Sequence, residues 1–373
     1  MRIGFPKESA AGERRVALVP DIVRKLASAG HEVVHEPGAG ESADLSDSAF
    51  ADAGASTGDP WDAEVVAKVA PPDAEEIARM GAETVLVGFL APLTAQNTIR
   101  ALAGQGTTSF AMEAIPRISR AQSMDALSSQ ANVSGYRAAL LASQELGRFF
   151  PMLMTAAGTI PPAQVLVLGA GVAGLQAIAT ARRLGAQVTA FDVRAAVKEQ
   201  VQSLGAKFLE LEGSADAEGA GGYARELTED EQVQQRELLA KAVARADVVI
   251  TTALVPGRPA PKLITAAAAE AMKPGSVIVD LAGEAGGNCE LTHPGETYRT
   301  PAGVIVAAPL NLPSSMAQHA SQLYARNVQS LLELFAKGEE ASLHLDFEDE
   351  IVAGACITRG GEIVHEGARK AAG

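Results

Sequence analysis

Residues 164–192 read QVLVLGAGVAGLQAIATARRLGAQVTAFD: an apolar run, a glycine-rich turn, an Ala-rich helical segment and a second apolar run. Short runs rich in Val and Leu are typical of buried strands, and a helix between two of them is typical of a parallel pair. Gly169, Gly171 and Gly174 follow the first run directly, in the spacing G-x-G-x-x-G. The stretch therefore predicts a βαβ unit of a doubly wound sheet.

Each residue of this turn has a physical role in such a unit. Gly169 permits a tight turn, Gly171 lets a phosphate approach the backbone, and Gly174 allows the helix to pack closely. Val172 and Ala173 open the helix, whose N-terminus carries a partial positive charge. We therefore expect these five residues to hold the pyrophosphate of a dinucleotide. A glycine turn that binds nothing is the alternative.

An acidic residue closes the second strand. Asp192 follows Gly169 at roughly the 20-residue spacing at which a carboxylate accepts the ribose hydroxyls of an adenosine. Its charge disfavours a 2′-phosphate, which predicts NAD(H) rather than NADP(H). Val193 and Arg194 are expected to line the same end, and the cation of Arg194 leaves NADP(H) open as an alternative. The similar stretch at 38–43, GAGESA, is interpreted as a decoy because of its acidic surroundings.

The alternation of strands and helices continues in both halves of the chain. The expected strands lie at 2–6, 31–37, 64–70, 84–90 and 107–113, and then at 246–253, 276–282 and 303–309. This pattern predicts an α/β fold of two doubly wound Rossmann-like domains with a cleft between them, bridged by long helices at 130–150 and 314–336. The expected domains are 1–135 with 320–373, and 136–319, which binds NAD(H).

Composition excludes several classes of protein. The chain has 373 residues, of which 47% are hydrophobic and 4% aromatic, so it is long enough for two cores. A net charge of −14 opposes binding to a phosphate backbone, so we expect no nucleic-acid partner. The two cysteines, Cys289 and Cys356, lie far apart without metal-ligand spacing, which predicts a reducing compartment and no metal site.

Residues 149–181 contain no charged side chain. Pro151, Pro161, Pro162 and several glycines interrupt this stretch, so it cannot form an unbroken membrane helix. We interpret it as buried protein and expect no direct insertion into a membrane. The N-terminus lacks the apolar core of a signal peptide, so no leader is expected.

A polar stripe follows Arg117. In RAQSMDALSSQ, residues 120–130, Gln122, Asp125 and Ser128 stand three residues apart, which predicts one face of a helix. The stretch has no His, Cys or Lys to act as a base. Hydride transfer between two nicotinamide rings needs no such base, because no O–H or N–H proton changes hands. A stripe that holds a carboxamide in register is sufficient for it.

The chain closely resembles the NAD(H)-binding components, or alpha subunits, of proton-translocating NAD(P) transhydrogenases (Si-specific/Re-specific class), in the alanine dehydrogenase/transhydrogenase superfamily. The resemblance spans essentially the whole chain and is most specific in MEAIPRISRAQSMDALSSQANVSGYRA and MTAAGTIPPAQVLVLGAGVAGLQAIATARRLGAQVTAFDVR. It implies direct hydride transfer between NADH and NADP⁺ held by a partner, a membrane-embedded beta subunit that binds NADP(H). A small membrane subunit, a homodimer and a cytoplasmic position on the inner face of the cell membrane are also implied.

The resemblance also assigns site residues. The family's nicotinamide-site residues fall on Arg117, Gln122, Asp125 and Ser128, and its mobile-loop Tyr falls on Tyr223. The acidic, Gly-rich segment 213–230 independently predicts a flexible lid, with an idle surface insertion as the alternative. Ala253 and Leu254 are expected to contact the cofactor.

Two other functions stay open at this stage: an alanine or amino-acid dehydrogenase, and a non-catalytic NAD(H)-sensing module. In alanine dehydrogenase, residues at Arg15 and Lys68 bind the substrate carboxylate. That enzyme also uses a catalytic His where this chain has Phe89, and an Asp where it has Glu284. We therefore place the dehydrogenase second, and we expect the six histidines to have structural or surface roles.

Overall fold

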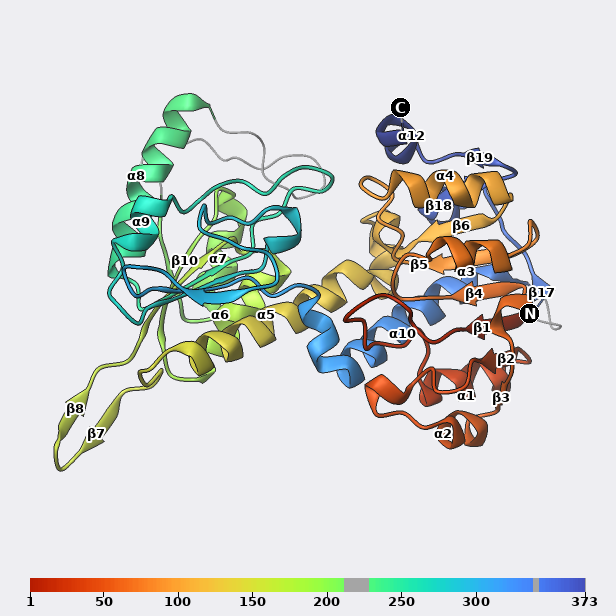
Figure 1. Ribbon diagram of the computed structural model, residues 1–373, viewed down its shortest axis with the longest axis horizontal. Helices are drawn as coiled ribbons and strands as arrows, with labels where there is room; N and C mark the ends of the chain where they lie inside the picture. Colours follow the sequence, from red (N-terminus) through yellow and green to blue (C-terminus); the bar gives the residue numbers. More distant parts are fainter. Residues whose placement is uncertain (211–227, 338–341, 373) are drawn as a thin grey trace. The chain divides into compact units, whose positions relative to one another are not determined.

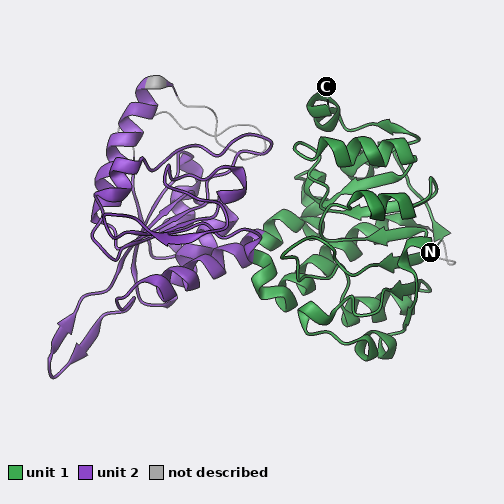
Figure 2. Cartoon of the chain, in the orientation of Figure 1, with its two compact units in different colours: residues 1–130, 313–373 green, residues 131–312 purple. Residues whose placement is uncertain are grey.

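The computed structural model describes residues 1–210, 228–337 and 342–372. The chain divides into two compact units, shown in Figure 2: unit 1 comprises residues 1–130 and 313–373, and unit 2 comprises residues 131–312. The first boundary lies inside a helix that was expected at 130–150, and the second lies just before the helix expected at 314–336. The expected division of the chain at 135/136 and 319/320 differs from these boundaries by a few residues at each point.

Unit 1 contains an eight-stranded sheet in the order β19-β18-β6-β5-β4-β1-β2-β3 (Figure 1). The six strands from β3 to β6 run parallel, and β18 and β19 are antiparallel additions at one edge. The strands are β1 (Arg2–Phe5), β2 (Glu32–His35), β3 (Ala55–Thr57), β4 (Val65–Ala67), β5 (Val85–Gly88), β6 (Thr108–Ala111), β18 (Cys356–Arg359) and β19 (Glu362–Ile363). This is the doubly wound order, whose switch point lies between β1 and β4.

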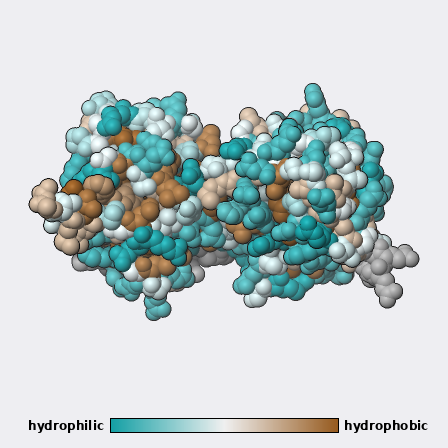
Figure 3. Space-filling model, turned by 90° about the horizontal axis from the view of Figure 1, so that it is seen from below, coloured by the Kyte–Doolittle hydropathy of each residue, from teal (hydrophilic) through white to brown (hydrophobic). Residues whose placement is uncertain are grey.

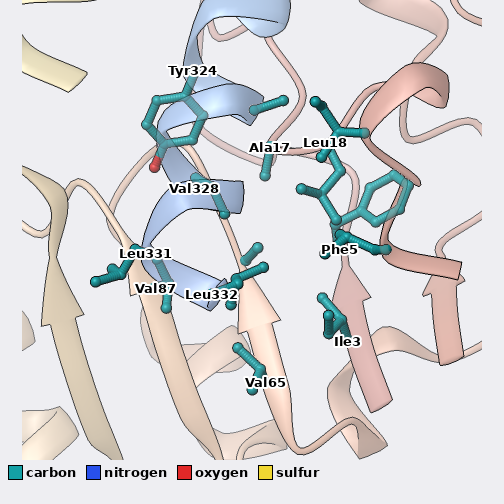
Figure 4. Close-up of a cluster of buried hydrophobic side chains, with 14 of the residues drawn as sticks. Ile3, Phe5, Ala17, Leu18, Val65, Val87, Tyr324, Val328, Leu331 and Leu332 are labelled. Carbon is teal, nitrogen blue, oxygen red and sulfur yellow. The ribbon is translucent and has the colours of Figure 1, made fainter. Parts of the chain in front are cut away.

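Helices cover both faces of this sheet. Val65 and Val87 pack on one face in the same core as α10, whereas Val66 and Leu86 pack on the other face with α3 and α4. Figure 4 shows Tyr324 and Val328 of α10 above the strands. The helices are α1 (Pro20–Ser28), α2 (Asp47–Asp52), α3 (Ala74–Arg79), α4 (Gln96–Gln105), α10 (Ala317–Phe335), α11 (Glu350–Ala355) and α12 (Glu366–Ala372). Alternate residues of each strand therefore face different helices, as expected for buried parallel strands.

Short 3-10 helices join several of these elements. They are η1 (Glu41–Ala43), η2 (Pro60–Asp62), η3 (Met112–Ala114), η4 (Ser119–Met124) and η8 (Leu312–Met316). A two-stranded ribbon, β16 (Ala336–Lys337) with β17 (Ser342–Leu343), follows α10. The chain then returns to the sheet through α11.

Unit 2 repeats the same architecture. Its seven-stranded sheet has the order β11-β10-β9-β12-β13-β15-β14, parallel except for β14. The strands are β9 (Gln164–Leu168), β10 (Gln187–Phe191), β11 (Lys207–Phe208), β12 (Val248–Thr251), β13 (Val277–Asp280), β14 (Thr297–Arg299) and β15 (Ile305–Ala307). The switch point here lies between β9 and β12. The predicted fold class, two doubly wound Rossmann-like sheets, is confirmed.

Two layers of helices enclose this second sheet. One core joins α5 and α6 to the sheet, and the other joins α8 and α9 to its opposite face. The helices of the unit are α5 (Ala126–Glu145, which begins in unit 1), α6 (Val172–Arg183), α7 (Lys198–Ser203), α8 (Glu229–Arg245) and α9 (Ala266–Glu270), with the 3-10 helices η5 (Ala195–Val197) and η7 (Gly283–Ala285). Among the described residues, no helix combines the length and the apolar character that a bilayer span requires.

The charge-free stretch that was interpreted as buried protein is partly an exposed hairpin. Strands β7 (Leu153–Thr155) and β8 (Gly158–Ile160) form a two-stranded sheet of their own and project from the body of unit 2 as an arm (Figure 1). Met152 and Met154 are 56% and 74% exposed. Brown and tan residues accordingly appear at the outer end of unit 2 in Figure 3. The interpretation was wrong because an apolar composition does not distinguish a core strand from a hairpin that leaves the core.

Candidate functional site

The glycine turn of unit 2 joins β9 to α6. Gly169 has φ +96°, and a side chain there would lie 2.6 Å from the hydroxyl of Thr252. A Cβ on Gly174 would lie 1.9 Å from the carbonyl oxygen of Gly169, so the helix meets the turn in direct contact. A Cβ on Gly171 would meet nothing within 4 Å. The three glycines thus serve the backbone conformation, close packing and open space respectively.

Open space at Gly171 lies at the start of α6. Gly171 is the residue before the first turn, followed by Val172 and Ala173, so the free N–H groups of the helix start at this point. Val172 is 38% exposed. The turn therefore offers unobstructed backbone donors and a helix N-terminus, which suit an anionic pyrophosphate.

Asp192 directly follows β10, the neighbour of β9. Its Oδ2 accepts a hydrogen bond from the N–H of Ala170 at 2.7 Å, so the carboxylate lies against the glycine turn. Arg194 donates to the same carboxylate from its backbone N–H, its Nε and its Nη2, at 2.7–2.9 Å. Burial opposes ionisation, but these hydrogen bonds outweigh it and hold the pKa of Asp192 below its usual range. The group is an anion at neutral pH, and a ribose must share it with Arg194.

The exit of β12 lies on the other side of β9. Thr252 donates from its hydroxyl to the carbonyl of Gly169 at 3.1 Å, which joins this exit to the glycine turn. Ala253 and Leu254 follow, and the side chain of Leu254 is 49% exposed. Ligands of doubly wound sheets bind at the carboxyl ends of the strands on either side of the switch point. The Gly169–Gly174 turn, Asp192 and Ala253–Leu254 all lie at such ends within unit 2.

The polar stripe lies in unit 1, but it does not form one helical face. Gln122 belongs to η4, which ends at Met124, and Ser128 belongs to the first turn of α5. Asp125 stands between the two helices and accepts hydrogen bonds from the N–H and the hydroxyl of Ser128, at 2.8 and 2.6 Å. The expected continuous helix is wrong at this point, because an Asp that caps a new helix ends the preceding one.

The two ends of the stripe have different surroundings. Arg117 and Gln122 are exposed. Asn327 of α10 holds the backbone between them and α5, since its Nδ2 donates to the carbonyl of Ser123 at 2.8 Å and its Oδ1 accepts from the hydroxyl of Ser129 at 2.7 Å. The stripe thus presents a guanidinium and an amide from a segment that α10 keeps in place. Tyr223 lies outside the described residues.

A buried cluster of charges occupies the switch point of unit 1, and only its cations were expected from the sequence. Lys68, which follows β4, is fully buried and lies 3.3 Å from Glu8 and 2.8 Å from Glu76. Arg15 binds Glu13 with two hydrogen bonds, at 2.8 and 2.6 Å. Glu8 also accepts from the N–H groups of residues 69 and 70.

This cluster leaves its cations compensated. Arg15 and Lys68 face the carboxyls of Glu8, Glu13 and Glu76. Burial raises the pKa of Glu8, yet even with Glu8 protonated the two remaining carboxylates balance the two cations. The sequence KESAAGERR contained Glu8 and Glu13, but only the fold shows that they meet Lys68 and Arg15 at one edge, because the cluster spans β1 and β4.

Phe89 lies in the same unit and packs its ring on Tyr324, with centroids 5.2 Å apart. Tyr324 is fully buried and donates to the carbonyl of Lys68 at 2.7 Å. Glu113 accepts from the N–H groups of Leu90 and Ala91, and burial raises the pKa of this carboxyl. These contacts fill the region after β5 with an apolar ring and a buried carboxyl.

Three of the histidines have clear structural or surface roles. His35 is fully buried and lies between the rings of Phe5 and Phe50. His365 accepts from the N–H of Ala368 at the start of α12. His293 lies on the surface beside Glu296. These roles agree with the expectation from the sequence.

Comparison with known protein families covers nearly the whole chain. Residues 4–134 match the model for the alanine dehydrogenase/PNT N-terminal domain, and residues 138–366 match the model for its C-terminal domain. An NAD(P) transhydrogenase alpha subunit of Rhodospirillum rubrum is 49% identical over 98% of both chains. The NAD(P) transhydrogenase subunit alpha of Haemophilus influenzae is 45% identical over 97% of this chain and 71% of that one.

Solved structures show the same relationship. A crystal structure of transhydrogenase from Sinorhizobium meliloti has a TM-score of 0.89 at 46% identity, covering 98% of this chain and 100% of that one. An L-alanine dehydrogenase structure has a TM-score of 0.82 at 29% identity, covering 100% and 99%.

Proposed function

The chain belongs to the alanine dehydrogenase/PNT family, and from this premise we propose that it is the NAD(H)-binding, hydride-transferring component of a proton-translocating NAD(P) transhydrogenase. The site in unit 2 fits NAD(H): the glycine turn has room for a pyrophosphate at Gly171, and Asp192 is an anion at the position of the adenosine ribose. Val193, Arg194, Ala253 and Leu254 line the rest of the proposed cofactor site.

The observation that carries the proposal is the state of Asp125. A dehydrogenase of alcohols or amines needs a base near the reacting carbon, whereas transfer between two nicotinamides does not. Both oxygens of Asp125 already accept hydrogen bonds from Ser128, and the neighbouring Arg117 and Gln122 are hydrogen-bond donors rather than bases at neutral pH. We propose that these residues position the carboxamide of the nicotinamide, with Tyr223 closing over it.

Bound NADH supplies the hydride, and NADP⁺ on the partner accepts it. The protein orients the ring, and no proton has to move at the stripe. The buried cluster at Arg15 and Lys68 disfavours the amino-acid dehydrogenase, since a substrate carboxylate would find both cations already balanced by Glu8, Glu13 and Glu76. Phe89, in place of a catalytic His, cannot carry a proton.

The partner is proposed to be a membrane-embedded beta subunit that binds NADP(H), with a small membrane subunit beside it. The relatives from R. rubrum and H. influenzae are both named as alpha subunits, which supports a multi-subunit assembly. In this proposal the chain is catalytic only with that partner and lies in the cytoplasm, on the inner face of the cell membrane. The described residues supply no membrane-spanning helix, so the membrane contact is assigned to the partner.

We further propose a homodimer, with the arm of β7 and β8 covered by a second copy. An isolated two-stranded hairpin is marginal in water, and this one exposes Met152, Met154 and Ile160 without any charged residue among 149–162. Sedimentation at micromolar concentration should give the dimer mass, and Met154→Asp should give the monomer. A monomeric wild type would contradict this assignment.

The proposed reaction is tested by single-turnover transfer from NADH to an NADP⁺-loaded partner domain. Gln122→Asn withdraws the amide by about one methylene, so transfer should fall on the order of a hundredfold while NADH affinity stays within about twofold. Gln329→Asn makes the same chemical change on α10, where the amide of Gln329 donates to the exposed Glu333, and serves as the matched control.

The outcomes separate the three candidate functions. Transfer by the wild type that is slowed by Gln122→Asn but not by Gln329→Asn supports the transhydrogenase component. Oxidation of NADH with pyruvate and ammonia by this chain alone would establish the amino-acid dehydrogenase instead. Tight NADH binding with neither reaction would leave the sensing module.

A further inference from the structure

Asn288 is a fully buried amide that the proposed function does not use. Its Oδ1 accepts from the N–H of Ala253 at 3.0 Å, and its Nδ2 donates to the carbonyls of Ala253 and Pro261, both at 2.8 Å. One side chain therefore satisfies both backbone groups of Ala253, as a neighbouring strand would do. Without it, these groups would have to find other partners at a point where the sheet has ended.

Asp280 holds Asn288 in turn. This buried carboxylate, at the end of β13, accepts from the N–H groups of Ala282, Asn288 and Cys289 and from the hydroxyls of Thr251 and Thr292. A Cβ on Gly287 would lie 2.5 Å from Thr292 and 2.7 Å from Asp280, so the backbone before Asn288 is closely packed as well. The amide is thus mounted on a rigid turn.

The segment that Asn288 holds lies on the nicotinamide side of the sheet. In a doubly wound sheet each half binds one mononucleotide, and the acidic residue after the second strand marks the adenosine half. Here β10 with Asp192 lies on one side of β9, and β12 with Ala253 lies on the other. The N–H of Ala253 would lie 3.3 Å from a Cβ on Gly169, so the segment also contacts the glycine turn.

We propose that Asn288 is a positioning residue for the nicotinamide half of the cofactor: it fixes the Ala253–Leu254 backbone beside the glycine turn, and the Asp280 turn fixes Asn288. This inference rests on the proposed cofactor site. Its consequence is selective, because the adenosine half is held separately by Asp192 and the turn. Loss of the amide should affect ligands that contain nicotinamide and spare ligands that lack it.

The test compares NADH with ADP-ribose, which lacks the nicotinamide, by calorimetry on the whole chain. Asn288→Ala should raise the dissociation constant of NADH about tenfold, the size expected for the loss of one to two hydrogen bonds, and should change that of ADP-ribose less than about twofold. Single-turnover transfer to the NADP⁺-loaded partner domain should fall on the order of a hundredfold, as for a displaced ring.

Thr292→Val is the matched control. It removes one hydrogen bond from Asp280 in the same buried network, but it leaves every contact of Asn288 with Ala253 and Pro261 in place. This variant should bind both ligands like the wild type. If Asn288→Ala does not fold, the near-isosteric Asn288→Asp replaces it, since it keeps the acceptor for Ala253 and loses both donor bonds.

Equal weakening of NADH and ADP-ribose would overturn the inference, and so would wild-type affinities and rates in the Asn288 variants. Failure of the proposed function is distinguishable, because the wild type itself would then transfer no hydride. The ratio of the two dissociation constants still decides the role of Asn288 in that case.

Discussion

The two units contain the same six parallel strands in the same order, yet their switch points are built in opposite ways. In unit 2 the loop after the first strand is a glycine turn, with open space at Gly171. In unit 1 the loop after β1 carries Glu8 and Glu13 inward, where they bind Lys68 and Arg15. One edge is left free for an anion, and the other is filled with charges of the chain itself.

The difference shows that strand order places a potential site without deciding whether a ligand occupies it. No neighbouring side chain occupies the space beside Gly171, whereas each cation at the corresponding edge of unit 1 already has a carboxylate within 3.3 Å. A buried pair of this kind contributes little net binding energy to an added ion, because its desolvation has been met internally.

The largest effect should come from closing the free edge. Gly174→Ala places a Cβ 1.9 Å from the carbonyl oxygen of Gly169, so the turn must move, and we expect a loss of about 4 kcal/mol in the free energy of unfolding with loss of NADH binding. Gly171→Ala meets nothing within 4 Å and should keep its melting temperature while NADH affinity falls. Calorimetry of both variants measures this, and equal melting temperatures would contradict the distinction.

Breaking the filled edge should cost stability and spare cofactor binding. Glu13→Gln leaves the buried guanidinium of Arg15 without its carboxylate, which should lower the free energy of unfolding by about 3 kcal/mol. Trp61, the only tryptophan, is buried in unit 1 near Lys68 and reports this unfolding by its fluorescence. NADH affinity measured on the folded variant should stay within about twofold, and a large loss would show that the edges are not independent.

The specificity of the free edge should be adjustable. Asp192→Ser removes the anion that would repel a 2′-phosphate and releases Arg194 from its present hydrogen bonds. We expect the NADH dissociation constant to rise about tenfold and the preference over NADPH to narrow by at least that factor. Calorimetric titrations with both nucleotides measure this preference. Equal affinity of the wild type for NADH and NADPH would remove the assigned role of Asp192.

The smallest expected effect concerns the pH dependence of unit 1. Burial raises the pKa of Glu113 above the value of 4.5 expected in the unfolded chain, so the folded state binds more protons in the interval between the two values. Stability should therefore fall as the pH rises from the unfolded pKa through the folded one. Glu113→Gln keeps an acceptor for the N–H groups of Leu90 and Ala91 and lacks this fall. Parallel pH curves for both proteins, followed by Trp61 fluorescence, would contradict it.

The sequence predicted what local patterns determine. The turn at Gly169, the strand before it and the helix after it are contiguous, so spacing alone identified them, and α10 matched its expected range closely. The buried cluster could not be predicted, because Glu8 and Glu76 meet Lys68 only when β1 and β4 become neighbours. Similarly, nothing local distinguishes the arm from a core strand, and the end of η4 at Asp125 depends on which helix that residue caps.

The order in which the units are completed follows from the division of the chain. Unit 2 is one continuous stretch, whereas unit 1 requires residues 313–373, which include α10 and the strand β18 that pairs with β6. On the ribosome, the face of β1, β4 and β5 that Tyr324 and Leu331 later cover stays bare while unit 2 is translated, for roughly 10–40 s at typical rates of synthesis. The nascent first half is thus an apolar sheet without its helix, which is the kind of surface that chaperones bind.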